Sequence, residues 1–325
     1  MKSIVTIGGG TGQYTLLSGL KKYPVHLSAV VSMADNGGST GKLRDELGVL
    51  PPGDVRQCLV ALSESESIMR ELFSYRFSEG GLSGHNFGNI FLSALEKISG
   101  NFDEAVRVAG MVLAVRGEVM PVTTGNVSLV CGRGDLFSGE MAINESSISP
   151  EDHRTLRLEP DAFANPKVVA AIESADCIVI GPGNLFCSVI PNLLVKGISE
   201  SIGRSKAKVV YNCNLMTKQG HTDGFSVTDF VREVEHYIGS GRVDYVTFND
   251  ERPDDELLNK YANEGRPVRI DEENFERHKF TPLGTNLMSG RLVAQRAGDT
   301  LRRTLIRHDA DIMANLIIQN CLGGL

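Results

Sequence analysis

The stretch SIVTIGGGTGQYTLLSGLKK, residues 3–22, decides the fold class of this 325-residue chain. The apolar run Ile4–Ile7 predicts a strand, the glycine-rich segment Gly8–Gly12 follows it directly, and Tyr14–Lys22 has the pattern of a helix. This order is typical of the first βα unit of a Rossmann-like sheet. Glycine lets a ligand approach the backbone, and the free N–H groups at the start of the helix attract phosphate.

The glycine loop has two interpretations. Gly9, Gly10, Thr11 and Gly12 are candidates for contacts with the phosphates of a nucleotide, because the loop lies between a strand and a helix. The dinucleotide fingerprint G-x-G-x-x-G is not met, however, since Gln13 occupies the place of its third glycine. A tight strand-to-helix turn without a ligand is therefore the alternative.

Short apolar runs alternate with helical patterns along most of the chain. This alternation predicts parallel strands joined by right-handed crossovers, an α/β fold of the Rossmann-like, doubly wound type with a mostly parallel sheet. The other expected strands are Leu27–Met33, Cys177–Ile180, Val209–Tyr211 and Tyr245–Phe248. The expected helices are Val55–Ser63 with Asp54 as N-cap, Gly88–Ile98, a helix that begins at Asn165-Pro166, Pro191–Ile202, Ser226–Ile238, Asp254–Glu264 and Asp309–Leu322.

One segment departs from this alternation. Val127–Cys131 and Leu136–Ile143 have the period of an antiparallel hairpin, which predicts a small antiparallel β insertion over about residues 118–160. No linker or repeat divides the sequence, so residues 1–325 are expected to form a single α/β unit with a C-terminal lobe over about 265–325. In the helix Gly88–Ile98, an apolar stripe that ends at Ile98 is expected to face the core.

A second glycine-rich segment, ADNGGSTGKLR at residues 34–44, follows the second expected strand. Asp35 stands where dinucleotide-binding units place the acidic residue that holds a ribose hydroxyl, and it equally suits a divalent cation. Asn36, Gly37, Gly38 and Ser39 are the other candidate ligand contacts of this turn. The string G-x-S-x-G also matches a nucleophile elbow, which makes a Ser39 hydrolase a minor alternative. A capped turn without chemistry is another.

Further polar segments follow an expected strand or open an expected helix. In PPGDVR, residues 51–56, Arg56 opposes the helix dipole, which suggests either a ligand anion or a surface salt bridge nearby. His85, in the loop of residues 81–89, is a candidate acid or base, although a structural histidine is commoner. Loops at the carboxyl ends of parallel strands converge on one crevice. The candidate contacts from these loops are His85, Asn86, Asn89, Gly181, Gly183, Asn184, Ser188 and Asn214.

The composition narrows the function classes. The formal net charge is −7 and the sequence has no basic run, so nucleic acid is not an expected partner. The sequence contains no stretch of ~20 apolar residues and starts without a signal-peptide pattern, so we expect a cytoplasmic protein without membrane insertion. The six cysteines are scattered, which favours free thiols over a zinc site.

Together and in this order, the motifs resemble the CofD-like superfamily and specifically its YvcK-type branch of gluconeogenesis factors. The matching segments are Gly8–Gly12, Asp35–Arg44, Leu50–Arg56, Gly84–Asn89, Gly181–Asn192 and Asn214–Thr217. The resemblance implies a Rossmann-like fold that binds a nucleotide sugar of the UDP-N-acetylglucosamine kind and links carbon metabolism to cell-wall synthesis and cell shape. It also implies that Asn192, Tyr261 and Arg307 contribute to the site, with Arg307 clamping a diphosphate and Tyr261, on an exposed helix face, stacking on a uracil.

The resemblance leaves alternatives open. CofD-type members are transferases that move a phospholactyl group onto a deazaflavin from a nucleotide-activated donor with a divalent metal, and in such an enzyme Asp35 would hold Mg²⁺. The family often has two adjacent aspartates where this chain has Asp35-Asn36, which favours binding without a required cofactor over metal-assisted catalysis. An NAD-like ligand is a further alternative. A cell-wall precursor or central-carbon enzyme is the expected protein partner, and a homo-oligomer is compatible with the sequence.

Overall fold

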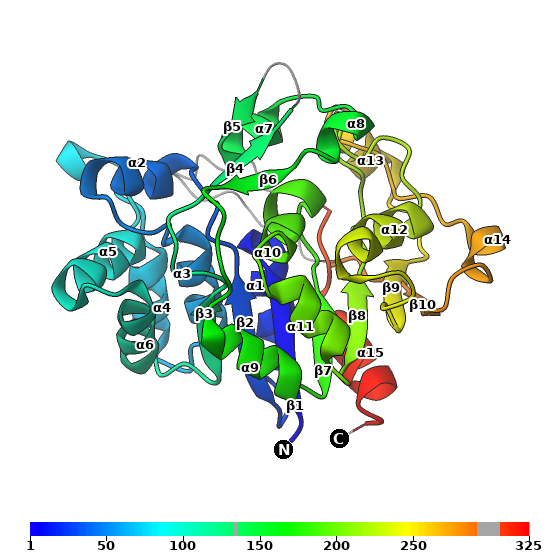
Figure 1. Ribbon diagram of the computed structural model, residues 1–325, viewed down its shortest axis with the longest axis horizontal. Coiled ribbons are helices and arrows are strands. Elements are labelled where there is room, and N and C mark those ends of the chain that lie inside the picture. Colours follow the sequence, from blue (N-terminus) through cyan, green and yellow to red (C-terminus); the bar gives the residue numbers. More distant parts are fainter. Residues whose placement is uncertain (133–135, 291–305, 325) are drawn as a thin grey trace.

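The computed structural model describes residues 1–132, 136–290 and 306–324. Its centre is a seven-stranded sheet with the strand order β10-β9-β8-β7-β1-β2-β3, in which every neighbouring pair is parallel (Figure 1). The doubly wound, Rossmann-like prediction is therefore confirmed. The strands are β1 (Ser3–Gly8), β2 (His26–Val31), β3 (Glu118–Pro121), β7 (Cys177–Ile180), β8 (Lys208–Asn212), β9 (Tyr245–Asn249) and β10 (Thr281–Thr285).

The strand order changes direction between β1 and β7. The chain runs outward from β1 through β2 to β3, then returns to β7 beside β1 and continues outward through β8 and β9 to β10. In an open α/β sheet, ligands bind in the crevice outside the carboxyl ends of the strands at such a point. The loops that follow β1 and β7, which carry the candidate contacts Gly9–Gly12 and Gly181–Ser188, meet here.

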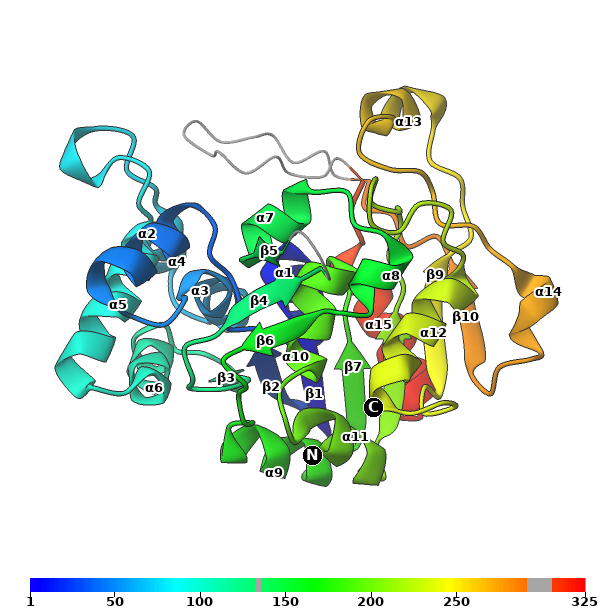
Figure 2. The same ribbon diagram turned by 45° about the horizontal axis from the view of Figure 1, so that its top comes forward.

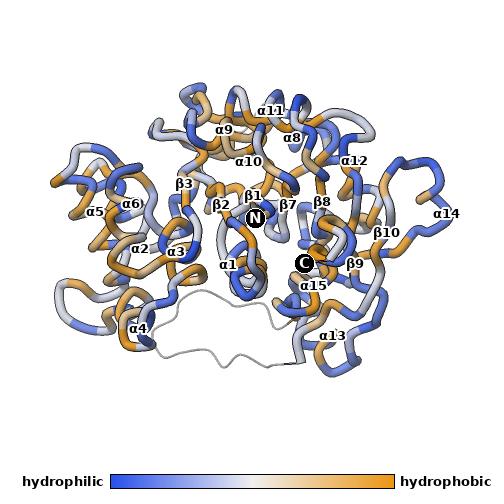
Figure 3. Tube along the Cα trace, turned by 90° about the horizontal axis from the view of Figure 1, so that it is seen from below, coloured by the Kyte–Doolittle hydropathy of each residue, from blue (hydrophilic) through white to orange (hydrophobic). Residues whose placement is uncertain are grey.

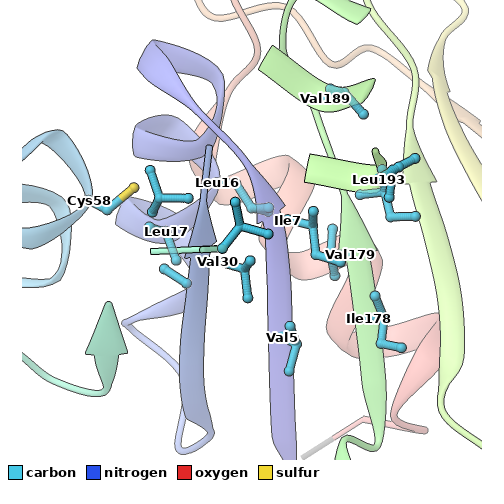
Figure 4. Packing of buried hydrophobic residues seen from close by; sticks show 14 of the residues in the cluster. Val5, Ile7, Leu16, Leu17, Val30, Cys58, Ile178, Val179, Val189 and Leu193 are labelled. Atoms are coloured by element: carbon cyan, nitrogen blue, oxygen red, sulfur yellow. The ribbon is translucent and has the colours of Figure 1, made fainter. Parts of the chain in front are cut away.

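Helices cover both faces of the sheet, as the view from below shows (Figure 3). Leu16 and Leu17 of the first helix are fully buried beside Ile7 and Val30 of the sheet (Figure 4). Burial of one such side chain stabilises the fold by roughly 1.5–3 kcal/mol. One face carries α1 (Gly10–Leu20), α3 (Gly53–Leu62) and α15 (Ala310–Cys321), and the other carries α9 (Pro166–Ser174), α10 (Ile190–Leu193), α11 (Ile198–Arg204) and α12 (Val227–Ile238).

The remaining helices flank the two edges of the sheet (Figure 1). Those beside β3 are α2 (Gly38–Leu47), α4 (Ser67–Ser74), the short 3₁₀ turn η1 (Gly80–Leu82), α5 (Phe87–Ser99) and α6 (Phe102–Val112). Those beside β9 and β10 are α13 (Asp255–Tyr261) and α14 (Glu272–Phe275). In the described part of the chain, no helix combines the length and apolar character that crossing a bilayer requires.

A small antiparallel sheet, β5-β4-β6, lies above the carboxyl ends of the central strands (Figure 2). It consists of β4 (Ser128–Cys131), β5 (Phe137–Ser138) and β6 (Arg157–Glu159), with α7 (Glu140–Glu145) and α8 (Pro150–His153) between β5 and β6. The insertion covers fewer residues than the expected range of about 118–160, because β3 pairs with β2 and belongs to the main sheet. The second hairpin strand also ends early: Gly139 has φ +95° and starts α7, so the predicted extension to Ile143 is wrong.

Several local predictions are confirmed. The strand Cys177–Ile180 has the predicted bounds, and Ser226 caps α12 in a capping box with Asp229. Asn165, Asp254 and Asp309 each accept a backbone N–H bond at the start of a helix. These signals are local, and a short polar side chain before a helix satisfies N–H groups that have no partner within the helix.

Other local predictions are wrong. Asp54 is not a cap, because α3 starts at Gly53 and the carboxylate of Asp54 turns toward the β1 loop. Ile98 is 83% exposed whereas Leu92 is fully buried, so α5 faces the core with another stripe. The expected helix Pro191–Ile202 is broken into α10 and α11, and the π turn η2 (Leu185–Val189) precedes it. Of the expected C-terminal lobe, residues 291–305 and 325 lie outside the described residues.

Candidate functional site

The loop after β1 holds a carboxylate. Gly10 has φ +62°, a left-handed conformation that favours glycine, and its N–H donates to Asp54. A Cβ atom on Gly9 would lie 2.5 Å from Oδ2 of Asp54. The backbone that the sequence predicts as a phosphate cradle therefore contacts the anionic side chain of Asp54, a residue 44 positions further along the chain than Gly10.

The loop after β7 packs directly on the loop after β1. A Cβ atom on Gly12 would come closer to the carbonyl oxygen of Pro182 than any real Cβ does. Gly181 has φ +73°, and Asn184 accepts the N–H of Cys187 at 3.3 Å to start the π turn. Gly12, in the first turn of α1 directly after the β1 loop, is thus required for packing against the loop after β7, whereas the sequence suggested that its backbone faces a ligand.

Three buried amide oxygens, those of Gln13, Asn192 and Asn214, lack a hydrogen-bond partner within the described residues, and the last two belong to predicted site residues. Asn192 is fully buried, and its Nδ2 donates to the carbonyl oxygens of Gly8 (3.1 Å) and Ser188 (2.8 Å) while its Oδ1 has no partner. Asn214 donates from Nδ2 to the carbonyl oxygen of Gly183 at 2.9 Å, and its Oδ1 is likewise buried and unpaired. A buried polar atom without a partner is costly, so both oxygens are acceptors available to a ligand or water.

A group of half-buried acids surrounds the loops after β1 and β2. Oδ1 of Asp35 accepts the N–H of Gly37 at 2.8 Å, and burial raises the pKa of Asp35. Burial and the neighbouring charge of Asp35 raise the pKa of Asp54 to about 7. Burial raises the pKa of Glu140 to about 8, with smaller contributions from the charges of Asp35 and Asp54, opposed by Lys218. We call Asp35, Asp54 and Glu140 the acidic cluster.

The acidic cluster supplies more than one carboxylate suited to a divalent cation. Asp54 supplies the second carboxylate that the sequence lacks at Asn36, so the loss of that aspartate no longer disfavours a cation. The described residues include no group of three or more His, Cys, Asp or Glu side chains placed to hold one ion. Mg²⁺ commonly binds one or two carboxylates together with substrate phosphates, and Asp35 and Asp54 fit that donor set.

Helix α7 of the insertion is tied to both halves of the crevice. Oδ1 of Asn36, in the loop after β2, accepts the N–H of Met141 at 2.9 Å. Nδ2 of Asn184, in the loop after β7, donates to Oδ1 of Asn144 at 2.8 Å. These two predicted ligand contacts are therefore engaged by α7, which lies over the loops.

The turn at the start of α2 meets the loop before α5. Oγ of Ser39 lies 3.3 Å from Nδ1 of His85, 3.3 Å from the backbone N of Asn86 and 3.4 Å from Nδ2 of Asn89. Four predicted site residues, drawn from two motifs more than 40 residues apart, are thus brought together. Arg56 donates from Nε to Oδ1 of Asn89 at 2.9 Å, so the predicted salt bridge is not required to explain its position.

Ser39 is expected to remain unlabelled by a fluorophosphonate probe, although a serine beside a histidine is the pair that a hydrolase needs. Its side chain is only 5% exposed and its oxygen accepts two N–H bonds, so it has little access to an electrophile. Peptide mass mapping after incubation checks this, with an active serine hydrolase labelled in parallel. A covalent adduct on Ser39 would revive the hydrolase interpretation.

The C-terminal candidates are less exposed than expected. Tyr261 is 7% exposed, and burial raises the pKa of its hydroxyl to about 12, so the prediction of an exposed ring that stacks on a base is wrong. Arg307 accepts the N–H of Ser289 with its carbonyl oxygen at 2.7 Å, and the next residue, His308, contacts the carbonyl oxygen of Cys213 just after β8. Arg307 therefore lies near the carboxyl end of β8.

A pocket of about 600 Å³ lies at the carboxyl ends of β8 and β9. Leu215, Phe248 and Ile270 are apolar residues that line it, and Asp250 is an acidic one. Asn214 also lines it, which joins the pocket to the loop after β7. The sequence did not predict this pocket, nor Asp54, Glu140 and Lys218 as site residues, because each depends on contacts between distant segments.

Comparisons with known proteins agree with this architecture. The model of the CofD family, described as 2-phospho-L-lactate transferase CofD, matches residues 4–288. A putative gluconeogenesis factor from Thermotoga maritima is 42% identical over 318 residues, which cover 97% of this chain and 98% of that protein. The gluconeogenesis factor of Bacillus subtilis is 38% identical over 320 residues, 97% of this chain and 96% of that protein.

A solved structure extends the likeness to three dimensions. The crystal structure of a UPF0052 family member from Bacillus halodurans superimposes with a TM-score of 0.87 at 37% sequence identity. The match covers 97% of this chain and 98% of that one. The α/β architecture with its small antiparallel sheet is therefore shared along nearly the whole length.

Proposed function

Because the chain belongs to the CofD family and is similar to gluconeogenesis factors along nearly its whole length, we propose that it is a cytoplasmic regulatory protein that binds a nucleotide sugar. The ligand is of the UDP-N-acetylglucosamine type and lies across the crevice between β1 and β7. Its occupancy couples carbon metabolism to cell-wall synthesis through a protein partner from one of these pathways.

The observation that carries the proposal is the unpaired amide oxygen of Asn214. This oxygen is buried, Asn214 lines the 600 Å³ pocket, and its amide nitrogen donates to Gly183 in the loop after β7. A sugar hydroxyl, an acetamido N–H or a base N–H would supply the missing donor. A diphosphate at the glycine loops joined to such a group would therefore engage both regions.

The acidic cluster favours a second candidate function. Asp35 and Asp54 are two half-buried carboxylates near the predicted phosphate-binding loops, and they are suited to a divalent cation. The resemblance implies that CofD-type transferases use such a cation. Such a cation would neutralise the charge of a diphosphate and align a leaving group. The two candidates differ in whether the ligand is changed and in whether a chelator removes binding.

Calorimetric titration with UDP-N-acetylglucosamine, with Mg²⁺ or with a chelator, tests both candidates. We expect saturable binding near the micromolar range, equivalent to about 8 kcal/mol, and mass analysis should recover the ligand unchanged. No saturable binding would contradict the proposal. Binding that requires Mg²⁺ and alters the ligand would establish the transferase instead.

Asn214→Ala is expected to weaken binding about tenfold, because the ligand loses one buried hydrogen-bond acceptor. Asn320→Ala is the matched control, since Asn320 is an exposed amide that bonds only within α15. Thermal unfolding of both variants separates a loss of affinity from a loss of fold. Equal affinities for the two variants would remove Asn214 from the site.

A further inference from the structure

A chain of hydrogen bonds runs from Arg56 through Asn89 and Ser39 to His85, and its direction is fixed at one end. Nε of an arginine can only donate a hydrogen bond, so the atom of Asn89 that lies 2.9 Å from it is the acceptor Oδ1. The amide orientation of Asn89 is thereby determined. Its Nδ2 must face Oγ of Ser39, 3.4 Å away, as a donor.

The same reasoning fixes the hydroxyl of Ser39. Its oxygen accepts one bond from Nδ2 of Asn89 and another from the backbone N–H of Asn86 at 3.3 Å. A hydroxyl has two acceptor lone pairs and one proton. Both lone pairs are used, so the proton of Ser39 is donated to the remaining neighbour, Nδ1 of His85 at 3.3 Å.

An imidazole that accepts at Nδ1 and is neutral carries its own proton on Nε2. His85 is half-buried, in the loop between η1 and α5, and it faces the turn that begins α2. The ring therefore presents a donor whose direction is set by the chain Arg56–Asn89–Ser39. With Nδ1 engaged and Nε2 protonated, His85 has no free lone pair to act as a base.

We propose that His85 donates its Nε2–H to an oxygen of the bound ligand at the Gly37–Ser39 turn, and that Ser39 is the positioning residue that fixes the tautomer. This inference rests on the proposed function and names one further contact of the same site. A neutral donor suits a phosphate or sugar oxygen, whereas a histidine base would need the opposite tautomer. The segments of residues 51–56 and 81–89, with Arg56 and His85, thereby share one role.

The tautomer can be measured without any ligand. Long-range ¹H–¹⁵N correlation spectra of protein labelled with ¹⁵N-histidine distinguish the Nε2–H, Nδ1–H and doubly protonated rings, and the loss of one of the seven histidine signals in His85→Gln assigns His85. We expect the Nε2–H tautomer at pH 7.5 and a mixture in Ser39→Ala. An Nδ1–H or doubly protonated ring in the unaltered protein would overturn the inference.

The ligand contact is tested by titration with UDP-N-acetylglucosamine. His85→Phe keeps a flat ring without a donor and is expected to bind about tenfold more weakly, whereas His85→Gln, whose amide N–H replaces Nε2–H, should lose threefold or less. Ser39→Ala should lie between them. His26→Phe, an exposed histidine at the opposite end of β2, is the control and should bind normally.

The outcomes separate this inference from the function on which it rests. If the unaltered protein binds and His85→Phe binds equally well, the His85 contact is wrong while the nucleotide-sugar site stands. If the unaltered protein does not bind, the proposed function fails and the contact fails with it. In either case, thermal unfolding of each variant shows whether the substitution altered the fold.

Discussion

Gly12→Ala is expected to destabilise the protein by about 3 kcal/mol and to abolish ligand binding. The added methyl group would overlap the carbonyl oxygen of Pro182, a backbone atom that cannot rotate away, so the loops after β1 and β7 must separate. Overpacking of a tight contact costs typically 1–3 kcal/mol, and a clash with backbone lies at the upper end. Urea unfolding gives the change in free energy, and titration gives the loss of binding.

Gly183→Ala is the matched control for this substitution. Gly183 belongs to the same loop pair, but a Cβ atom there would meet its nearest neighbours at 3.5 Å, an ordinary contact. We expect its unfolding midpoint to stay close to that of the unaltered protein. If Gly12→Ala also left the midpoint unchanged, the two loops would not be packed as described.

The second large effect concerns Asp54 and pH. Its pKa is about 7 in the folded protein and near 3.8 in the unfolded chain, so between these values the folded state holds the proton more tightly. The stability gained from this protonation is fully present below pH 3.8 and is lost as the pH rises through about 7. For Asp54 alone the difference is on the order of 4 kcal/mol.

Asp54→Asn is expected to flatten this dependence and to raise the stability of the ligand-free protein at pH 8. The amide keeps an oxygen for the N–H of Gly10 but cannot ionise beside Asp35. Urea unfolding at pH 5 and pH 8 measures the change, and Asp45→Asn, at an exposed position on α2, should leave the slope unaltered. An unchanged slope in Asp54→Asn would mean that Asp54 does not titrate in this range.

The same variant discriminates between the two candidate functions. If the ligand binds without a metal, removing a negative charge from the glycine loop should tighten the binding of an anionic diphosphate. If Asp54 holds a divalent cation, the substitution should instead abolish Mg²⁺-dependent binding. The sign of the affinity change therefore decides which role Asp54 has.

The part of the fold that the sequence predicts is the part encoded in local patterns. The run Cys177–Ile180 is apolar throughout, as a strand buried on both faces must be, and Ser226 precedes α12 with the spacing of a capping box. The edge strands β3 and β10 were missed because each contains a proline, Pro121 and Pro282. Proline weakens the strand signal and is tolerated at sheet edges.

The sequence predicted the loops of the candidate site and Asp35, but not Asp54 and Glu140, the other two acids of the acidic cluster. Glycine segments that follow strands can be recognised in the sequence. Asp54, in contrast, has the position of a helix cap, and Glu140 lies within a predicted hairpin strand. Their raised pKa values arise because segments around residues 35, 54 and 140 are buried together. The prediction that Tyr261 is exposed was wrong because the burial of a residue at a helix end depends on the distant segments that pack over it.

The pairing of β1 with β7 delays completion of the central sheet during chain synthesis. Ile4 of β1 lies opposite Cys177 of β7. β1, the first strand synthesised, can therefore pair with β7 only after more than half of the chain has been translated. The unit of β1, α1 and β2 can form early from nearby residues, but a contact of such long sequence separation forms slowly. A nascent chain that ends before residue 180 lacks the loop after β7 and therefore has no crevice, so ligand recognition requires the second half of the polypeptide.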